Sequence, residues 1–193
     1  MILSNQELHK AIDEGRLLIE PEPQPRIPSL GVDCPYDTHS VNLKLGNEIL
    51  VPKKGKYCID LCKPGSLPEA IKAISDTYKI TNEQPYLLES HKFILASTLE
   101  KISLPMTTER PYLAARIEGK SSRARLGLIV HCTAPTVHPG FSGILTLEMV
   151  NFGPTDIILK PQMYIAQLIV EQVFGEIHTN VSQFQDQTSP SGL

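Results

Sequence analysis

The 193-residue sequence contains no tryptophan, and its four cysteines include no Cys-x-x-Cys pair. Its first residues, MILSNQELHK, have no apolar run of the length found in a signal peptide. The cysteine pattern and the lack of a signal-peptide run both favour a reducing compartment, so we expect a cytoplasmic location. Cys58 and Cys62 are four residues apart, a spacing that suits a metal site on a helix, but the apolar alternation in YCIDLC indicates a strand. We therefore predict no metal site there.

The sequence also lacks a strong net charge. Its 18 basic and 21 acidic residues give a formal charge of −3, which provides no field that would attract nucleic acid or a membrane surface. Neither partner is expected. Hydrophobic residues make up 41% of the chain, enough at this length to bury a core without disulfides. No repeat or linker divides the chain, so residues 1–193 are predicted to form a single domain.

Turn-forming residues are frequent, with 16 prolines and 12 glycines, as in β-sandwiches and barrels. SVNLKLGN and EILVP predict two strands joined as a hairpin at Gly46 and Asn47. Further short apolar segments lie at 86–88, 93–98, 112–117, 127–133, 143–150, 156–159 and 164–174. Their spacing predicts a mainly β fold of the jelly-roll or barrel type.

Helical patterns are few. Ser4 is placed as the N-cap of a short amphipathic helix within residues 1–20, and Gly15 is placed to end it. A second helix is predicted in SLPEAIKAISDTYKI, where apolar residues recur every three or four positions. Residues 21–35 contain so many prolines that an irregular segment is expected there.

Gly119-Lys120-Ser121-Ser122 has the composition of a phosphate-binding turn. The glycine allows close approach of the backbone to an anion, the hydroxyls donate hydrogen bonds, and the lysine offsets the phosphate charge. Position 114, where a P-loop has a glycine, is Ala114. An ordinary surface turn is therefore the alternative.

Glu148 is an acidic residue in the apolar run GILTLEMVN, which indicates a buried strand. Burial of a carboxylate is costly, so this group should have a raised pKa or a stabilising partner. That tunability suits a general base. A structural salt bridge with Arg125 or Arg123 is the alternative interpretation.

The preceding segment HCTAPTVHPGFSG predicts a tight loop whose backbone groups present donors and acceptors to a flat base. His131 and His138 are seven residues apart, and the chain contains neither an HExxH motif nor the zinc-deaminase signature. No catalytic zinc is expected.

The whole run GKSSRARLGLIVHCTAPTVHPGFSGILTLEMVN resembles the core signature of bacterial dCTP deaminases, usually GRSSxARLGLxVHxTA followed by hxPGaxGxhxLExxN, where h is apolar and a is aromatic. Three further segments resemble other parts of that family: MILSNQELHKAIDEGRLLIEP, SVNLKLGN and LKPQMYIAQLIVEQ. The chain is thereby identified as an atypical member of the dCTP deaminase and dUTPase superfamily.

This resemblance implies a homotrimer of dUTPase-like, distorted jelly-roll subunits with active sites between neighbours. The implied substrate is a nucleoside triphosphate with Mg²⁺ bound through its phosphates, and no zinc takes part. Glu148 would activate the water that attacks C4 of cytosine, with Ser121 and Arg125 positioning the water and stabilising charge. Lys120 and Ser122 would hold phosphate.

The remaining substrate contacts that the resemblance implies lie in the following loop. Backbone groups at Cys132 and Ala134 would read the edge of the base. Thr136, Val137 and His138 would lie around the rest of the substrate.

Several positions depart from the family's usual residues. Lys120 replaces an arginine, Asn42 replaces an aspartate, and His138 replaces an acidic residue expected at the sugar. Thr136 and Pro135 replace an arginine or other polar residue and a histidine. The sugar and phosphate subsites are therefore altered.

The polar C-terminal segment, residues 181–193, is expected to be mobile and resembles the family's lid. It keeps Gln187 and an aromatic ring at Phe184, whereas Gln183 replaces the lid's lysine.

The resulting functional hypothesis is conversion of dCTP to dUTP and ammonia by a dCTP deaminase-type hydrolase. A dUTP pyrophosphatase, alone or combined with deamination, is one alternative. A nucleotide-binding regulator without turnover is another, and the altered residues are also compatible with CTP, a diphosphate or a modified cytosine nucleotide.

Overall fold

Helix α1 (Asn5–Asp13) forms as the N-terminal sequence predicts. The structure, a computed structural model, describes residues 1–60, 67–106, 111–179, 182 and 184–193. Ser4 Oγ accepts a hydrogen bond from Glu7 N at 3.4 Å, and Gly15 adopts a φ of +68° just after the helix. Leu8 on the apolar face is buried. The predicted N-terminal helix is therefore confirmed.

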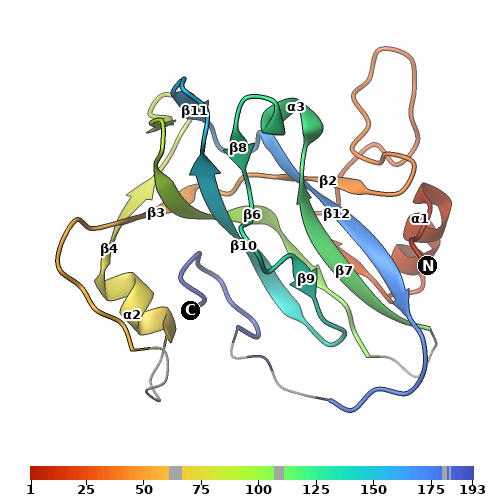
Figure 1. Cartoon of the computed structure of the whole chain (residues 1–193). Coiled ribbons are helices and arrows are strands. Elements are labelled where there is room, and N and C mark those ends of the chain that lie inside the picture. The colour runs from red at the N-terminus through yellow and green to blue at the C-terminus, as the bar shows by residue number, and fades with distance from the viewer. Residues whose placement is uncertain (61–66, 107–110, 180–181, 183) are drawn as a thin grey trace.

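Residues 21–35 form the irregular segment that their prolines predict. Figure 1 shows this part of the chain as a loop that projects beyond α1 and β2 (Val41–Lys44). Leu30 in this segment is fully exposed.

Two antiparallel sheets and a separate strand pair make up the β structure (Figure 1). The larger sheet has the order β4 (Ser75–Lys79), β3 (Glu48–Pro52), β6 (Phe93–Ser103), β10 (Ser142–Asn151) and β8 (Leu128–Ile129), and β1 (Leu18–Glu20) also pairs with β6. The second sheet has the order β2, β12 (Tyr164–Val173), β7 (Tyr112–Gly119) and β9 (Thr136–Val137). The pair consists of β11 (Ile157–Leu159) and β5 (Tyr86–Leu88).

One apolar core joins the two sheets. Leu43 and Leu168 of the smaller sheet belong to the same buried cluster as Ile94 and Leu147 of the larger one. Burying each such side chain stabilises the fold by roughly 1.5–3 kcal/mol. Most strands pair with partners distant in sequence, so the predicted mainly β, jelly-roll type of fold is confirmed. No helix of the described residues is long and apolar enough to cross a membrane.

The predicted hairpin at Gly46 and Asn47 is wrong. Strand β2 pairs with β12 in one sheet, whereas β3 pairs with β4 and β6 in the other. The chain crosses between the sheets at Gly46, whose N–H donates to Ser97 O at 2.8 Å. A Cβ at Gly46 would lie 3.2 Å from that same oxygen, so the close crossing explains the glycine.

The second predicted helix is only half correct. Helix α2 (Leu67–Ala73) ends early, and the following residues form β4, which pairs with β3 over five residues. Helical and extended patterns are both compatible with this short segment, and pairing with β3 decides between them. The strand expected at YCIDLC is also wrong, because its residues 57–60 lie outside any helix or strand. Cys58 is exposed, and Cys62 lies outside the described residues.

Candidate active site

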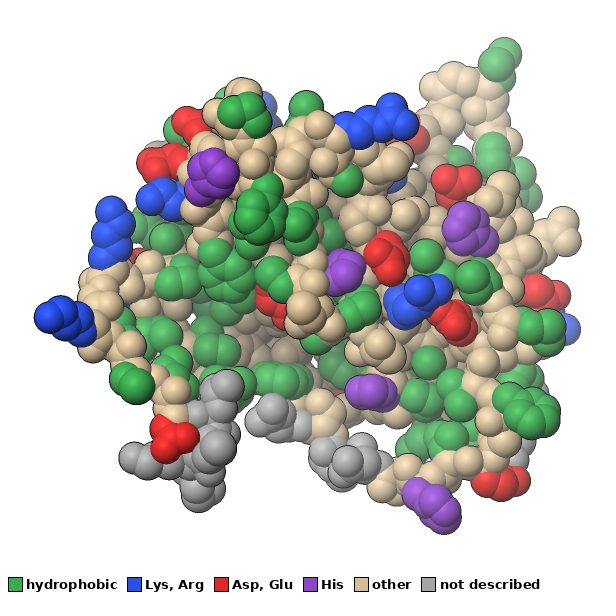
Figure 2. Space-filling view, in the orientation of Figure 1, with side chains coloured by type: hydrophobic (Ala, Val, Ile, Leu, Met, Phe, Trp, Pro, Cys, Tyr) green, Lys and Arg blue, Asp and Glu red, His purple; other side chains and the backbone are tan. Residues whose placement is uncertain are grey.

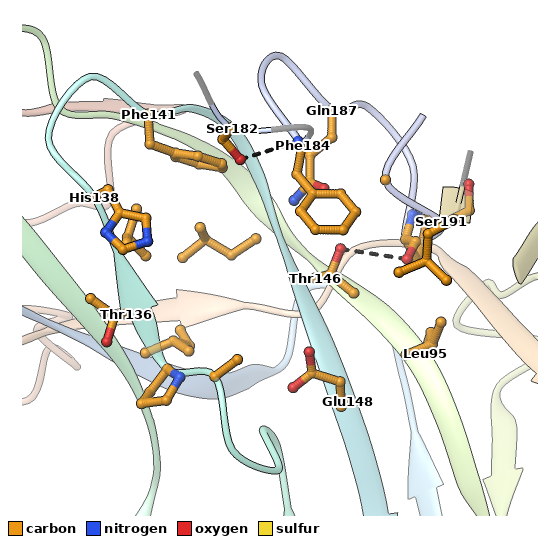
Figure 3. Close-up of a pocket in the computed structure, with 18 of the residues that line it drawn as sticks. Leu95, Thr136, His138, Phe141, Thr146, Glu148, Ser182, Phe184, Gln187 and Ser191 are labelled. Atoms are coloured by element: carbon orange, nitrogen blue, oxygen red, sulfur yellow. Dashed lines mark hydrogen bonds between the residues drawn. The ribbon is translucent and has the colours of Figure 1, made fainter. Parts of the chain in front are cut away.

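Glu148 lies on the half-exposed face of β10. Burial alternates along this strand, so Leu145, Leu147 and Met149 face the core, whereas Thr146 and Glu148 are partly exposed. The expectation of a continuously buried strand is therefore wrong, because β10 has one face on the core and the other on a cavity. The carboxylate is directed into this cavity (Figure 3).

The cavity has a volume of about 420 Å³, within the range of pockets that bind small molecules. Figure 2 shows this face of the molecule hollowed near its centre, with hydrophobic side chains around the hollow. The lining comes from α2, β6, β7, the segment before β10 that includes β9, β10 itself and the C-terminal segment: Leu67, Ile71, Leu95, Ile117, Ala134, Pro135, Thr136, Val137, His138, Phe141, Leu145, Thr146, Glu148, Ser182, Phe184, Gln187, Pro190, Ser191 and Gly192.

The Glu148 carboxylate contacts the loop that precedes β10. Cys132 N donates a hydrogen bond to Glu148 Oε2 at 3.3 Å, and Cys132 Sγ donates to Glu148 O at 3.7 Å. Burial and the nearby Glu148 carboxylate raise the pKa of the Cys132 thiol, which favours its protonated form. No ion pair among the described residues joins Glu148 to Arg123 or Arg125, so the structure does not support that alternative.

The loop carrying Ala134 to His138 is held in place by the smaller sheet. Thr136 and Val137 form β9, a strand that the sequence pattern did not predict, and they pair with β7. The carbonyl of Pro135 accepts from Ile117 N at 2.9 Å. Figure 3 shows His138 and Thr136 on one side of the cavity and Leu95 on the other, with Glu148 between them.

The C-terminal segment closes another side of the cavity. Asp186 N donates to Ser142 O at 2.7 Å, and the Gln187 side chain donates to Ile144 O at 2.6 Å. Gln187 is buried and forms a parallel bridge with Gly143. This contact brings the predicted Gln187 to the cavity, whereas Gln183 lies outside the described residues.

The other predicted site residues lie apart from this cavity. Lys120 is the N-cap of α3 (Ser121–Ala124), and Arg125 is its C-cap. Ser121, Ser122 and Arg125 are exposed. None of these four residues lines the Glu148 cavity, and Figure 1 shows α3 beside β8, away from the C-terminal segment. Within one subunit, the sequence-predicted site is therefore divided into two groups.

Lys120 is not a free surface lysine. Its Nζ donates a hydrogen bond to Asn42 Oδ1 on β2. Burial lowers the pKa of the Lys120 ammonium, whereas the carboxylates of Asp33 and Asp37 act in the opposite direction.

Sequence reasoning missed several residues that face the cavity. Phe141, Thr146 and Ser191 line it, yet their positions carry no polar motif of their own. Only the alternation along β10 could have indicated Thr146, because it shares the face of Glu148.

Residues 2–173 match the model of the dCTP deaminase-like family. The chain belongs to this family. A dCTP deaminase of Natronomonas pharaonis is 34% identical over 98% of this chain and 92% of its own length. A protein of Dictyoglomus thermophilum named "dCTP deaminase, dUMP-forming" is 37% identical over 87% of this chain and 78% of its own.

A solved structure supports the same fold. The 2′-deoxycytidine 5′-triphosphate deaminase of Agrobacterium tumefaciens aligns with a TM-score of 0.61 and 16% identity over 88% of this chain. The chain spans about half of that solved chain, 47% of its length. The predicted mainly β fold and the predicted dCTP deaminase-type hydrolase class of this chain are confirmed, and the chain is thus an enzyme.

Proposed function

We propose that this enzyme deaminates dCTP to dUTP and ammonia without zinc, with Glu148 activating the water. One observation carries the proposal. The Glu148 carboxylate faces a cavity of about 420 Å³, and a hydrogen bond from the Cys132 amide orients it there. The dCTP deaminases among the relatives support the choice of substrate.

The reaction requires only water as co-substrate. Glu148 takes a proton from water as the water oxygen bonds to C4 of cytosine. The Glu148 carboxyl group then delivers that proton to N4. Attack moves the C4=N3 electron pair to N3. The C4–N4 bond then breaks and ammonia departs, while the hydroxyl proton of the new C4 oxygen is transferred to N3, where uracil carries it. Ser121 and Arg125 would position the water and stabilise the charge at the tetrahedral centre.

The separation of the two residue groups supports a site shared between subunits. Glu148 lies in the cavity, whereas Ser121 and Arg125 are exposed on and beside α3. We infer a homotrimer in which α3 of one subunit completes the Glu148 cavity of the next. In this arrangement Lys120 and Ser122 would approach the phosphates.

The base and sugar would occupy the cavity beside the loop before β10. The backbone at Cys132 and Ala134 would read the base edge, in keeping with the contact of Cys132 N to Glu148 and with Ala134 in the cavity lining. Thr136, Val137 and His138, which also line the cavity, would lie around the rest of the substrate. Gln187 holds the C-terminal segment against β10 at the cavity wall. The magnesium ion would accompany the substrate, with triphosphate and water oxygens as its ligands.

The decisive experiment is incubation of the purified protein with dCTP, CTP, dCDP and dUTP in the presence of Mg²⁺, with products identified by mass. We expect dUTP and ammonia from dCTP. Glu148→Gln should lower kcat by at least about a thousandfold, because the amide cannot accept the proton. Binding of dCTP without any product, or full activity of Glu148→Gln, would contradict the proposal.

A second candidate is formation of dUMP from dCTP by deamination followed by pyrophosphate release. Relatives from Dictyoglomus thermophilum and Nanoarchaeum equitans bear the name "dCTP deaminase, dUMP-forming". His138 is the cavity residue that could accept a proton for the second step. Pyrophosphate among the products of dCTP or dUTP would establish this candidate in place of the first.

A further inference from the structure

Lys120 is held from across the smaller sheet. Its Nζ donates to Asn42 Oδ1, so the start of α3 is tied to β2. Strand β12 runs between them, and its Gln167 lies opposite Asn42 on one side and Glu118 on the other. Since residues directly opposite each other share a face of the sheet, Asn42 and Gln167 project from the same side.

The backbone next to Lys120 is held in the same way. Gln167 Nε2 donates to Gly119 O at 3.1 Å, and Gln167 Oε1 accepts from Ser40 Oγ at 3.1 Å. Ser40 is fully buried, which anchors this chain of hydrogen bonds. Both the backbone before Lys120 and its ammonium therefore have defined partners.

The ammonium keeps capacity for an anion. Lys120 has three N–H donors, and Asn42 is its hydrogen-bond partner among the described residues. Asn42 is neutral, and none of the ion pairs between described residues includes Lys120. A neutral acceptor orients the lysine without cancelling its charge.

We propose that Asn42 is a positioning residue that directs the Lys120 ammonium toward the phosphates of the nucleotide. The inference rests on the proposed function, in which Lys120 holds phosphate. It also accounts for two departures from the family pattern together, because the unusual lysine and the unusual asparagine contact each other.

The test is steady-state kinetics with dCTP on the wild type, Asn42→Ala, Lys120→Ala and the double variant. Asn42→Ala should raise KM about three- to tenfold and change kcat less than about twofold, because an oriented charge contributes to binding. The double variant should have the KM of Lys120→Ala, since Asn42 acts only through the lysine. Thermal unfolding of each variant confirms that it folds, and Asn42→Ser replaces Asn42→Ala if the latter does not fold.

Asn47→Ala provides a matched control, because Asn47 is an exposed asparagine in the connection after β2. It should keep the wild-type KM. An unchanged KM in Asn42→Ala, or additive effects in the double variant, would overturn the inference. Absence of dCTP turnover by the wild type would refute the proposed function instead, so the two failures are distinguishable.

Discussion

Cys132 N donates a hydrogen bond to Glu148 Oε2, with 3.3 Å between the two atoms. The contact joins the loop before β10 to the one carboxylate that lines the cavity, within the part of the chain that the structure describes. The carboxylate is contacted by the backbone N–H of Cys132, whereas the thiol contacts only the backbone oxygen of Glu148, at 3.7 Å, so the side chain at position 132 is expected to be replaceable.

Cys132→Ala should therefore keep kcat/KM for dCTP within about threefold of the wild type, because alanine retains the N–H donor. Glu148→Gln is the comparison that should lose turnover. The measurement is ammonia release from dCTP. Loss of activity in Cys132→Ala comparable with that of Glu148→Gln would show that the thiol takes part.

Glu148→Gln and Arg125→Ala should complement each other when mixed. If each site uses Glu148 from one subunit and α3 from the next, random trimers formed at equal ratio contain intact sites at about one position in four. Mixing the unfolded subunits and refolding them together should thus restore about a quarter of the wild-type activity. Mixing without subunit exchange is the control, and no recovery after verified exchange would argue against a shared site.

Glu100 should make stability depend on pH. This β6 carboxylate is 1% exposed and accepts hydrogen bonds from Lys44 N at 2.9 and 3.2 Å, and burial raises its pKa to about 7. Because the unfolded chain ionises Glu100 near pH 4.5, its favourable contribution is complete below that pH and is lost as pH rises through 7.

Replacing this group should reveal the effect. Between pH 4.5 and 8, the free energy of unfolding of Glu100→Gln should rise relative to that of the wild type by about 2 to 3 kcal/mol. Urea unfolding at several pH values measures it. Glu20→Gln, at an exposed glutamate of β1, is the control and should follow the wild type. A constant difference between Glu100→Gln and wild type would contradict the predicted titration.

Gly127→Ala should destabilise the region that follows α3. Gly127 has a φ of +89°, and an added Cβ would lie 2.2 Å from the backbone nitrogen of Gly153. Gly31 has a similar φ of +76° but no atom within 4 Å of that position. Thermal or urea unfolding should show a loss of at least about 3 kcal/mol for Gly127→Ala, against about 1 kcal/mol for Gly31→Ala. Equal losses would indicate that backbone strain alone matters at Gly127.

Local patterns were sufficient for much of the fold. Ser4 and Gly15 delimit α1 as predicted, because capping depends on a few neighbouring residues. The apolar segments between turn residues correspond to most of the strands. Strand pairing was not determined locally. Gly46 follows β2 as a turn residue would, but its N–H bonds to Ser97 of β6, and the chain continues in the other sheet.

The sequence by itself determined the chemical groups of this enzyme and its family, because its motif from Gly119 to Asn151 is long and continuous. Only the tertiary structure decided how these groups are distributed. The alternation of β10 leaves Glu148 facing a cavity, and the order of strands places α3 away from it. The contact between Lys120 and Asn42 likewise depends on the tertiary structure, because the two residues are 78 positions apart in sequence. They meet because β12 pairs with β2 along one edge and with β7 along the other.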